Sequence, residues 1–420
     1  MVKSVFEFHN VGQGLFYSGI ISNRNDNFAI VYDCGSASKE EYLNMQIDRF
    51  KKFLNKKMKN NVDLLIISHF HRDHINGIPY LLKDKTIKIN TVILQDLSEI
   101  QKLENYLYYI KQNKNKNGEL YKNEKSELSR LILHPIEYFL EKGIRKIVLV
   151  SGNDENEDGH YINSEQEINE DVSENNGSSS VTINSNDIIR KNKNVIYTKN
   201  NIKCKNKLWE FCFSCDEQIN LTIHNEIKKY LKKHNYKIEE VISDEIKIKK
   251  LINVLDMHKP KLKFNESSMI LVHHPIYNNN FYTMHSKLNN KYIIHECKYK
   301  HHVGCDLFNR CLDCCFNSCD CKKHNKSPST ILTGDVVLNN EVCSVIKQFV
   351  NNNIPVIFQV PHHGSKPNSE NCISFVNSYS KVCSIIPCGY MYNHPSQYIY
   401  NSLDKPYIVD MYHSYVYMID

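Results

Sequence analysis

The chain has 420 residues, of which 41% are hydrophobic and 10% aromatic, so it holds enough apolar side chains to bury a core and is not disordered throughout. A mean hydropathy of −0.49, with only short apolar runs, excludes a membrane-spanning helix and a signal peptide, and we expect a soluble, cytoplasmic protein. The net charge is +6, but ten acids and no Lys or Arg lie between Lys146 and Arg190, which leaves +16 on the rest. This basic remainder favours an anionic partner, with ordinary solvated lysines as the alternative.

Helix-like and strand-like segments alternate along the chain, which predicts an α/β fold. Residues 5–34 alternate apolar and polar side chains around glycine-rich turns and are expected to form a meander of strands. The predicted helices span residues 40–54, 78–82, 128–140, 217–234 and 244–255. The strands predicted after the meander span residues 62–67, 89–94, 146–150, 268–272, 330–332, 356–360 and 382–386.

The predicted organisation is one core enlarged by long insertions rather than a series of domains. Residues 1–152 are the first half of the core, and residues 327–420 are the second half. Residues 153–260 are expected to be an insertion, with an acidic flexible loop followed by a helical segment. Core strands follow at residues 261–294, and residues 295–326 form a second insertion that is rich in Cys and His.

A run of metal-ligating residues follows the predicted strand at residues 62–67. This run is HFHRDH, which begins at His69. His69 and His71 are two residues apart, so one turn can aim both imidazoles at a single ion, while Asp73 and His74 can reach a second ion. The sequence therefore predicts a metal site at the end of this strand.

This pattern resembles the metallo-β-lactamase superfamily, whose members are αββα sandwiches that hold one or two metals, usually zinc, in loops at one sheet edge. Further motifs are similar, in the same order, to the hydrolase domain of the DNA-uptake competence protein ComEC. They are VGQG at residues 11–14, YDCG at 32–35, NESS at 265–268, LTGD at 332–335, VPHHGS at 360–365 and NHP at 393–395. The similarity covers most of the two predicted core halves but not the middle of the chain, and the ComEC membrane channel has no counterpart here.

The resemblance implies a role for each matching residue. His69 and His71 hold one metal, and Asp73 and His74 hold the other. Asp335 bridges both metals, and His394 completes the second site. Two such ions, zinc or manganese, activate a bound hydroxide as nucleophile. Of His362 and His363, one binds metal and the other protonates the leaving group or contacts phosphate, in an order that the sequence leaves open.

Further residues near these motifs could support or replace the metal ligands. Asp33, at a strand end, is expected to orient a ligand histidine rather than to bind metal. Many members of the superfamily supply a third histidine to the first metal where this chain has Ser267 and Ser268. His362 is one replacement, and His273 or His274 is another, although a place in the core or on the strand surface is the alternative for these two.

The second insertion contains seven cysteines in a stretch of 25 residues. This density favours a structural zinc site, separate from the histidine site. An oxidised cluster and uncoordinated thiols are the alternatives. The seven are Cys297, Cys305, Cys311, Cys314, Cys315, Cys319 and Cys321.

The function predicted from these features is that of a metal-dependent hydrolase, a phosphodiesterase or nuclease that acts on nucleic acid or another phosphodiester, with no membrane partner. Two alternatives remain. One is a hydrolase of small esters, thioesters or lactams, and the other is a non-catalytic metal-binding interaction or sensor module.

Overall fold

The structure is a computed structural model, and some segments are left undescribed. The described residues are 3–23, 27–58, 60–83, 86–112, 126–152, 182–184, 188–190, 194–199, 202–206, 208–216, 221–257, 267–276, 281–287, 292–293, 327–351, 353–379 and 382–419.

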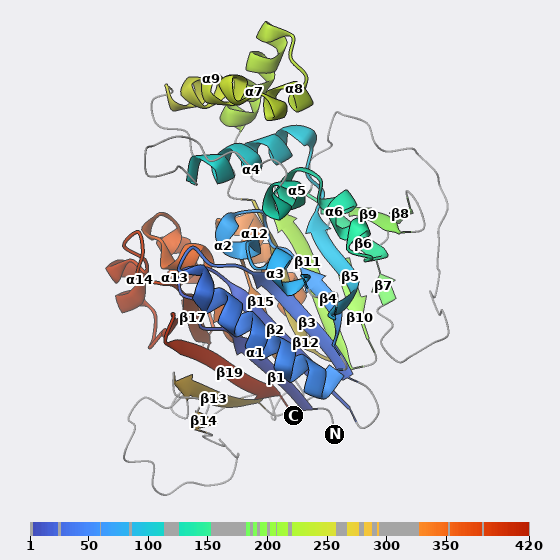
Figure 1. The fold of residues 1–420 in the computed structure, drawn as a ribbon. Coiled ribbons are helices and arrows are strands. Elements are labelled where there is room, and N and C mark those ends of the chain that lie inside the picture. Colours follow the sequence, from blue (N-terminus) through green and yellow to red (C-terminus); the bar gives the residue numbers. More distant parts are fainter. Residues whose placement is uncertain are drawn as a thin grey trace, which may run out of the picture.

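Eleven described strands form the first sheet (Figure 1). Strands β3 to β9 along this sheet are parallel, whereas those on the β1 side are antiparallel. In spatial order the strands are β14 (Tyr292–Ile293), β13 (Phe281–Lys287), β19 (His413–Ile419), β1 (Lys3–Phe8), β2 (Phe16–Ser22), β3 (Asn27–Cys34), β4 (Asn61–Ile66), β5 (Lys88–Gln95), β6 (Lys146–Ser151), β9 (Val195–Lys199) and β8 (Ile188–Arg190).

Eight described strands form the second sheet, which packs face to face with the first. Its strands from β15 to β18 are parallel, and the others are antiparallel. In spatial order they are β18 (Tyr407–Val409), β17 (Cys383–Pro387), β16 (Ile354–Gln359), β15 (Pro328–Leu332), β12 (Ser268–Pro275), β11 (Trp209–Asp216), β10 (Ile202–Lys205) and β7 (Thr182–Asn184).

Helices cover the outer face of each sheet, so the strands are buried on both sides. In β3, for example, Ile30 and Tyr32 face the other sheet, and Ala29 and Val31 face the helices. The helices on the first sheet are α1 (Glu40–Met58), α2 (Arg72–Ile75), α3 (Ile78–Leu81), α4 (Glu99–Gln112), α5 (Glu127–Leu133) and α6 (Pro135–Glu141), with α7 (Leu221–His234), α8 (Ile238–Ser243) and α9 (Glu245–Asp256) stacked on α4 (Figure 1). On the second sheet lie α12 (Asn340–Val350), α13 (Ser369–Asn377), α14 (Gln397–Ser402) and the 3-10 turns η1 (Pro361–Gly364) and η2 (Lys366–Asn368).

This arrangement of layers confirms the predicted αββα sandwich. Most of the predicted strands and helices are present, with their ends shifted by a few residues. None of the helices that the structure describes combines the length and apolarity needed to cross a membrane.

The helices differ from the prediction in several places, and α8, α12, α13 and α14 have no predicted counterpart. The single helix expected over residues 128–140 is divided into α5 and α6, because Pro135 lacks a backbone N–H and His134 before it has a non-helical backbone, with φ −134° and ψ 59°. No helix is predicted between residues 95 and 127, yet α4 lies there. Its buried Leu103, Leu107 and Ile110 have the helical spacing that marks its inner face.

The predicted insertion over residues 153–260 also needs correction, because part of it belongs to the sheets. Strand β9 extends the first sheet beside β6, and β10 and β11 belong to the second sheet. Trp209, Phe211 and Phe213 alternate along β11 and are fully buried between the sheets, which is the period of a strand. Helices α7, α8 and α9 lie in the last part of this span. The acidic residues 153–181 lie outside the described part of the chain.

Between the sheets runs a buried chain of polar side chains that starts at the protein's single tryptophan. Trp209 Nε1 donates to His273 Nδ1 at 3.0 Å, so the His273 proton lies on Nε2 and is donated to Tyr17 Oη at 2.7 Å. Tyr17 and Tyr417 then share a hydrogen bond of 2.6 Å between their hydroxyls, and Tyr417 Oη lies 2.5 Å from Thr330 Oγ1. His273 therefore lies in the core. This was the alternative to a role as replacement metal ligand.

We predict that His273→Ala lowers the free energy of unfolding by about 2–4 kcal/mol, because it opens a cavity and leaves the Trp209 N–H and the Tyr17 hydroxyl without one partner each. Urea denaturation followed by Trp209 fluorescence measures this change. His134→Ala, at an exposed histidine whose side chain makes no capping hydrogen bond, is the control and is expected to be near neutral. Equal stability of the two variants would contradict a buried polar chain that matters for folding.

Burial, with a smaller effect of His274, lowers the pKa of His273 to about 3. Between pH 6.5 and about 3 the unfolded chain therefore binds a proton that the folded chain excludes, so this residue makes stability fall as the pH falls through that window. We expect the loss of stability on acidification to be smaller in His273→Ala than in the unchanged protein, measured by denaturation at several pH values.

Candidate metal centre

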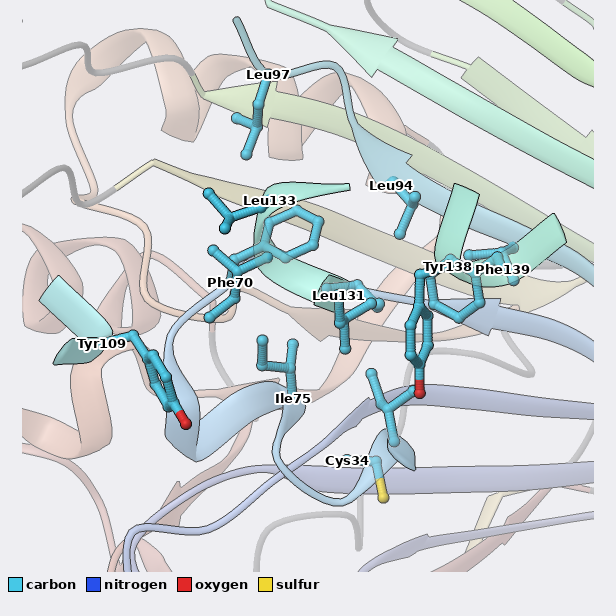
Figure 2. Packing of buried hydrophobic residues seen from close by; sticks show 14 of the residues in the cluster. Cys34, Phe70, Ile75, Leu94, Leu97, Tyr109, Leu131, Leu133, Tyr138 and Phe139 are labelled. Atoms are coloured by element: carbon cyan, nitrogen blue, oxygen red, sulfur yellow. The ribbon is translucent and has the colours of Figure 1, made fainter. Parts of the chain in front are cut away.

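The loop that carries the HxHxDH motif begins where β4 ends and is anchored by its apolar residues. Phe70 and Ile75 are fully buried and point into the cluster between the first sheet and its helices, among Leu131 and Leu133 of α5 (Figure 2). His69, which precedes Phe70, lies instead beside Asp335, with its Nε2 3.8 Å from Asp335 Oδ2. The apolar positions of the motif thus fix the loop, and its polar positions form the site.

A glycine at the end of β3 lets this loop approach closely. A Cβ added to Gly35 would lie 2.5 Å from the backbone of Asp73 and His74, which no real side chain tolerates. The VGQG motif at residues 11–14 also holds this loop, because Leu15 N, directly after the motif, donates to the carbonyl of Asp73 at 3.1 Å. The two glycine motifs in the first 35 residues therefore form the seat of the metal-ligating loop.

Asp33 orients two of the histidines from behind. Its carboxylate accepts hydrogen bonds from His74 Nδ1 at 2.8 Å, from Ser68 N at 2.7 Å and from Ser68 Oγ at 2.6 Å. Since the Ser68 hydroxyl gives its only proton to Asp33, it accepts from His69 Nδ1 at 2.9 Å. Both histidines are thus held with Nε2 directed into the site, the nitrogen that a metal would use.

Asp335 lies at the centre of the site, at the end of β15. Gly334 before it has φ +54°, and a Cβ there would lie 2.2 Å from Ser268 Oγ, which accepts from Asp335 N at 3.1 Å. The histidines divide between the two carboxylate oxygens of Asp335. Oδ2 lies 3.8 Å from His69 Nε2 and 3.5 Å from His362 Nδ1, whereas Oδ1 lies 3.3 Å from His74 Nε2 and 4.0 Å from His363 Nε2. This is the arrangement expected of a carboxylate that bridges two ions.

The Oδ1 side of Asp335 contains a second carboxylate. His363 Nε2 lies 3.1 Å from Asp73 Oδ2, and His363 Nδ1 donates to the carbonyl of Pro387 at 2.6 Å. His363 has φ +53°, a conformation that is rare for a side chain of this size and turns its ring inward. Asp73, His74 and His363 form one candidate metal group, and His69, His74 and Asp335 form another.

The electrostatics of the site favour positive charge at its centre. Burial lowers the pKa of His74, but the carboxylates of Asp335 and Asp33 outweigh burial and raise it well above its ordinary value. The same competition raises the pKa of His363. Burial raises the pKa of Asp73, but its hydrogen bond with His363 and the charges of His74 and His363 hold it at about 2. Protons here balance buried carboxylates, a role that divalent cations fill better.

Buried atoms without hydrogen-bond partners show that the residues fit a metal. Such atoms belong to five residues in or beside the site: His69 Nε2, His74 Nε2, Asp335 Oδ1, His362 Nε2 and His394 Nδ1. Leaving one buried polar atom unpaired costs about 1–3 kcal/mol, so five in one place are unfavourable unless a ligand pairs with them. Imidazole nitrogens and carboxylate oxygens are the donors that zinc and manganese accept in proteins.

Two predicted ligands lie at the edge of the cluster. The His71 ring lies 4.5 Å from that of His69 and 4.3 Å from that of Tyr108 on α4. His394 is half-buried beside the site and has no polar contact with Asp335 as short as those of the inner histidines. The resemblance gave His394 as the ligand that joins Asp73 and His74. In the structure it is His363 that lies beside these two residues.

The remaining predictions concern residues outside the cluster. His273 and His274 lie at the far end of β12 from Ser268, so neither replaces the missing third histidine. Ser268 instead lies behind the site, with its hydroxyl 3.5 Å from His69 Nδ1. Asn265, Glu266 and the seven cysteines between Cys297 and Cys321 fall outside the described residues.

The sequence reasoning missed Tyr108 and the Pro387 carbonyl. Tyr108 lies on the unpredicted helix α4, where its neighbours in the sequence have the pattern of an ordinary buried helix face. The contact between Pro387 and His363 depends on the arrangement of β17 beside η1, which no local pattern reveals.

Comparison with known proteins assigns the domain. Residues 17–116 match the sequence model of the metallo-beta-lactamase superfamily, a span that includes β2 to α4 and the whole HxHxDH motif. The chain therefore carries a metallo-beta-lactamase superfamily domain, in agreement with its αββα layers.

Two further comparisons add no assignment. Among solved structures, the chain is similar to the metallo-beta-lactamase fold protein YhfI from Bacillus subtilis, with 22% identity and a TM-score of 0.16 over 24% of this chain and 41% of that one. A search of curated proteins finds no match.

We predict that the unchanged protein retains zinc at this site after dialysis and that His74→Ala removes it, because His74 belongs to both candidate groups. The raised pKa of His74 means that a metal must displace a proton there, so metal affinity falls as the pH falls, beginning above 6.5. Metal content per chain and competition with a chelator at several pH values measure both effects. His134→Ala should keep the full metal content, and retention of all metal by His74→Ala would exclude this residue as a ligand.

Asp33→Asn tests the orienting role separately from direct ligation. Asp33 has φ +55°, a conformation that Asn also adopts readily, so the backbone is retained while one of the acceptors of Ser68 and His74 is lost. We expect zinc affinity to fall by about 10- to 100-fold. Asp63→Asn is the matched control, because Asp63 is equally buried but accepts from Ala29 N rather than from a site residue. An equal fall in both variants would mean that the effect is one of general destabilisation.

Proposed function

We propose that this protein is a metal-dependent hydrolase that cleaves phosphodiester bonds in single-stranded nucleic acid. The superfamily domain supports metal-dependent hydrolysis. The observation that carries the proposal is the division of four histidines between the two oxygens of Asp335, which suits a pair of ions that share one carboxylate.

The proposed roles follow from these contacts. Two divalent ions bound here would polarise a phosphoester and supply a water-derived nucleophile near neutral pH. His69, with His71 and His362, is assigned to the ion on the Oδ2 side of Asp335. Asp73, His74 and His363 are assigned to the ion on the Oδ1 side.

The chain itself provides orientation and a proton. Asp33 and the Pro387 carbonyl fix the tautomers of His74 and His363, so the ligand nitrogens need no rearrangement when substrate binds. We assign proton transfer at the leaving oxygen to His394, because it is half-buried next to the inner residues but makes none of their short contacts with Asp335. Burial lowers the pKa of His394, so the neutral imidazole predominates, and its protonated form is the stronger acid for it.

An aromatic rim beside His394 supports nucleic acid as the substrate. Tyr390 and Tyr392 are 62% and 71% exposed, unusual for large side chains, and the Tyr392 ring lies 6.4 Å from that of His394. Both tyrosines and Asn393 have positive φ, a backbone conformation that costs energy and is common at ligand clamps. Exposed aromatic rings stack on unpaired bases of any sequence.

Charge and sequence similarity support the same substrate class. Outside the acidic stretch the chain carries a net charge of +16, which favours a polyanion. The motifs that resemble the ComEC hydrolase domain include those of the inner site, at residues 332–335 and 360–365.

The deciding experiment compares substrates with the zinc- and manganese-loaded protein: a chromogenic bis-phosphodiester, a chromogenic carboxyl ester, and labelled single- and double-stranded DNA and RNA. We expect turnover of the bis-phosphodiester and of single strands, both lost in Asp335→Asn. Turnover of the carboxyl ester alone would favour a small-molecule hydrolase. A metal-loaded protein without turnover on any substrate would favour the binding module.

We predict that Tyr392→Ala raises the KM for single-stranded nucleic acid by about 5- to 150-fold, the equivalent of one lost base stack, and leaves turnover of the small bis-phosphodiester unchanged. Steady-state kinetics on both substrates measure the difference. Tyr236→Ala, between α7 and α8, is the control and should change neither value. An equal effect of Tyr392→Ala on both substrates would contradict the stacking role.

A further inference from the structure

A second group of side chains able to bind a metal lies on the second sheet, at the end away from the candidate metal centre. Glu210 and Cys212 are two residues apart on β11, so they share a face, and His274 on β12 pairs directly with Glu210 across the strands. This face is the outer one, where Cys212 packs under the α12 layer. His274 is six residues along β12 from Ser268, about 20 Å in an extended strand, so the group is separate from the candidate metal centre.

The three side chains have nearly the geometry of a bound transition metal. Glu210 Oε1 lies 3.6 Å from Cys212 Sγ and 3.8 Å from His274 Nε2, and all three ligand atoms lie within 4.8 Å of one another. Around a tetrahedral zinc with ordinary bond lengths, such ligand atoms are about 3.3–3.6 Å apart. Shifts of a few tenths of an ångström would bring the Glu210 contacts into this range.

Hydrogen bonds outside the group hold two of its members in the form that binds metal. His274 Nδ1 donates to the Pro275 carbonyl at 3.1 Å, so Nε2, which faces Glu210, carries the lone pair. Lys205 Nζ lies 2.6 Å from Glu210 Oε2 and fixes the carboxylate. Its Oε1 then faces Cys212 and His274, with the half-exposed Lys203 Nζ 3.8 Å away. This is the orienting role that partners of metal ligands commonly have.

A nearby buried hydroxyl is consistent with a ligand at this place. The register of β12 and β15 pairs His273 with Thr330 and so sets Ser329 opposite His274 on the same face. Ser329 is fully buried, and its hydroxyl has no hydrogen-bond partner. A metal-bound water above the three side chains would be a natural partner for it.

We propose that Glu210, Cys212 and His274 bind one divalent transition-metal ion, with zinc as the best match to a thiolate, an imidazole and a carboxylate. The thiol of Cys212 gives up its proton to solvent when the ion binds, and the fourth position is left to water. Binding of a divalent ion with loss of the Cys212 proton adds one net positive charge beside Lys203 and Lys205, whose side chains are 47% and 44% exposed, so that water screens this charge.

Native mass spectrometry of the zinc-loaded full chain tests this site, because it counts ions per folded chain. We expect Cys212→Ala and His274→Gln each to hold one zinc fewer than the unchanged protein. Cys204→Ala is the matched control: Cys204 is equally buried on the neighbouring strand but faces the other sheet, so its variant should keep the full count. His69→Ala should lose metal independently of Cys212→Ala, which separates the two sites.

Cobalt substitution provides the second measurement, since a thiolate ligand gives a charge-transfer absorption that imidazole and carboxylate ligands do not. We expect Cys212→Ala, but not Cys204→Ala, to lose part of this absorption. An unchanged zinc count in both Cys212→Ala and His274→Gln would overturn the proposal and leave an ion-pair network of Lys205, Glu210 and His274. Equal loss in the Cys204→Ala control would overturn it as well, because the loss would then reflect general damage to the sheet.

Discussion

The buried carboxylate of Asp33 is the group on which the candidate metal centre depends. It ends β3 in a left-handed conformation and joins that strand to the loop after β4 through Ser68 and His74. A carboxylate is stable at this depth only because each of its bonds comes from a donor that must itself point the right way. Hydrogen bonds from Ser68 and His74 thus replace the water that would solvate the Asp33 carboxylate, and the same bonds fix the orientation of these two residues. Ser68 in turn orients His69.

In this fold the faces of the sheets serve packing, and the loops at the strand ends carry the chemistry. The apolar faces of both sheets bind the helices, and the polar groups gather where β3, β4 and β15 end. Within one loop the same division occurs from residue to residue, since Phe70 and Ile75 enter the core between polar neighbours. Loops at strand ends can carry costly groups because the sheets beneath them are rigid.

Sequence reasoning found those features that depend on neighbours in the chain. The HxHxDH run, the buried strand before it and the carboxylate of the LTGD motif were all recognisable locally, and so was the class of fold. Features that depend on contacts between distant parts of the chain could not be predicted from the sequence. Strand β11 lies in a stretch that is polar on average, so its alternation of aromatic residues was overlooked, and the place of His363 beside Asp73 is set by a turn nearly three hundred residues away. Helix α4 was missed for a simpler reason, because Tyr and Asn within it weaken its apolar pattern.

The pairing of β1 with β19 has a consequence for the order of folding. Ser4 bonds to Ile419 across β1 and β19, and His363 reaches Asp73 over a separation of 290 residues. Such contacts close very large loops, which makes them late events in folding. A growing chain on the ribosome would expose His69, His71, Asp73 and His74 long before Asp335 is made. The candidate metal centre can therefore form only after Asp335 and His363 have been synthesised.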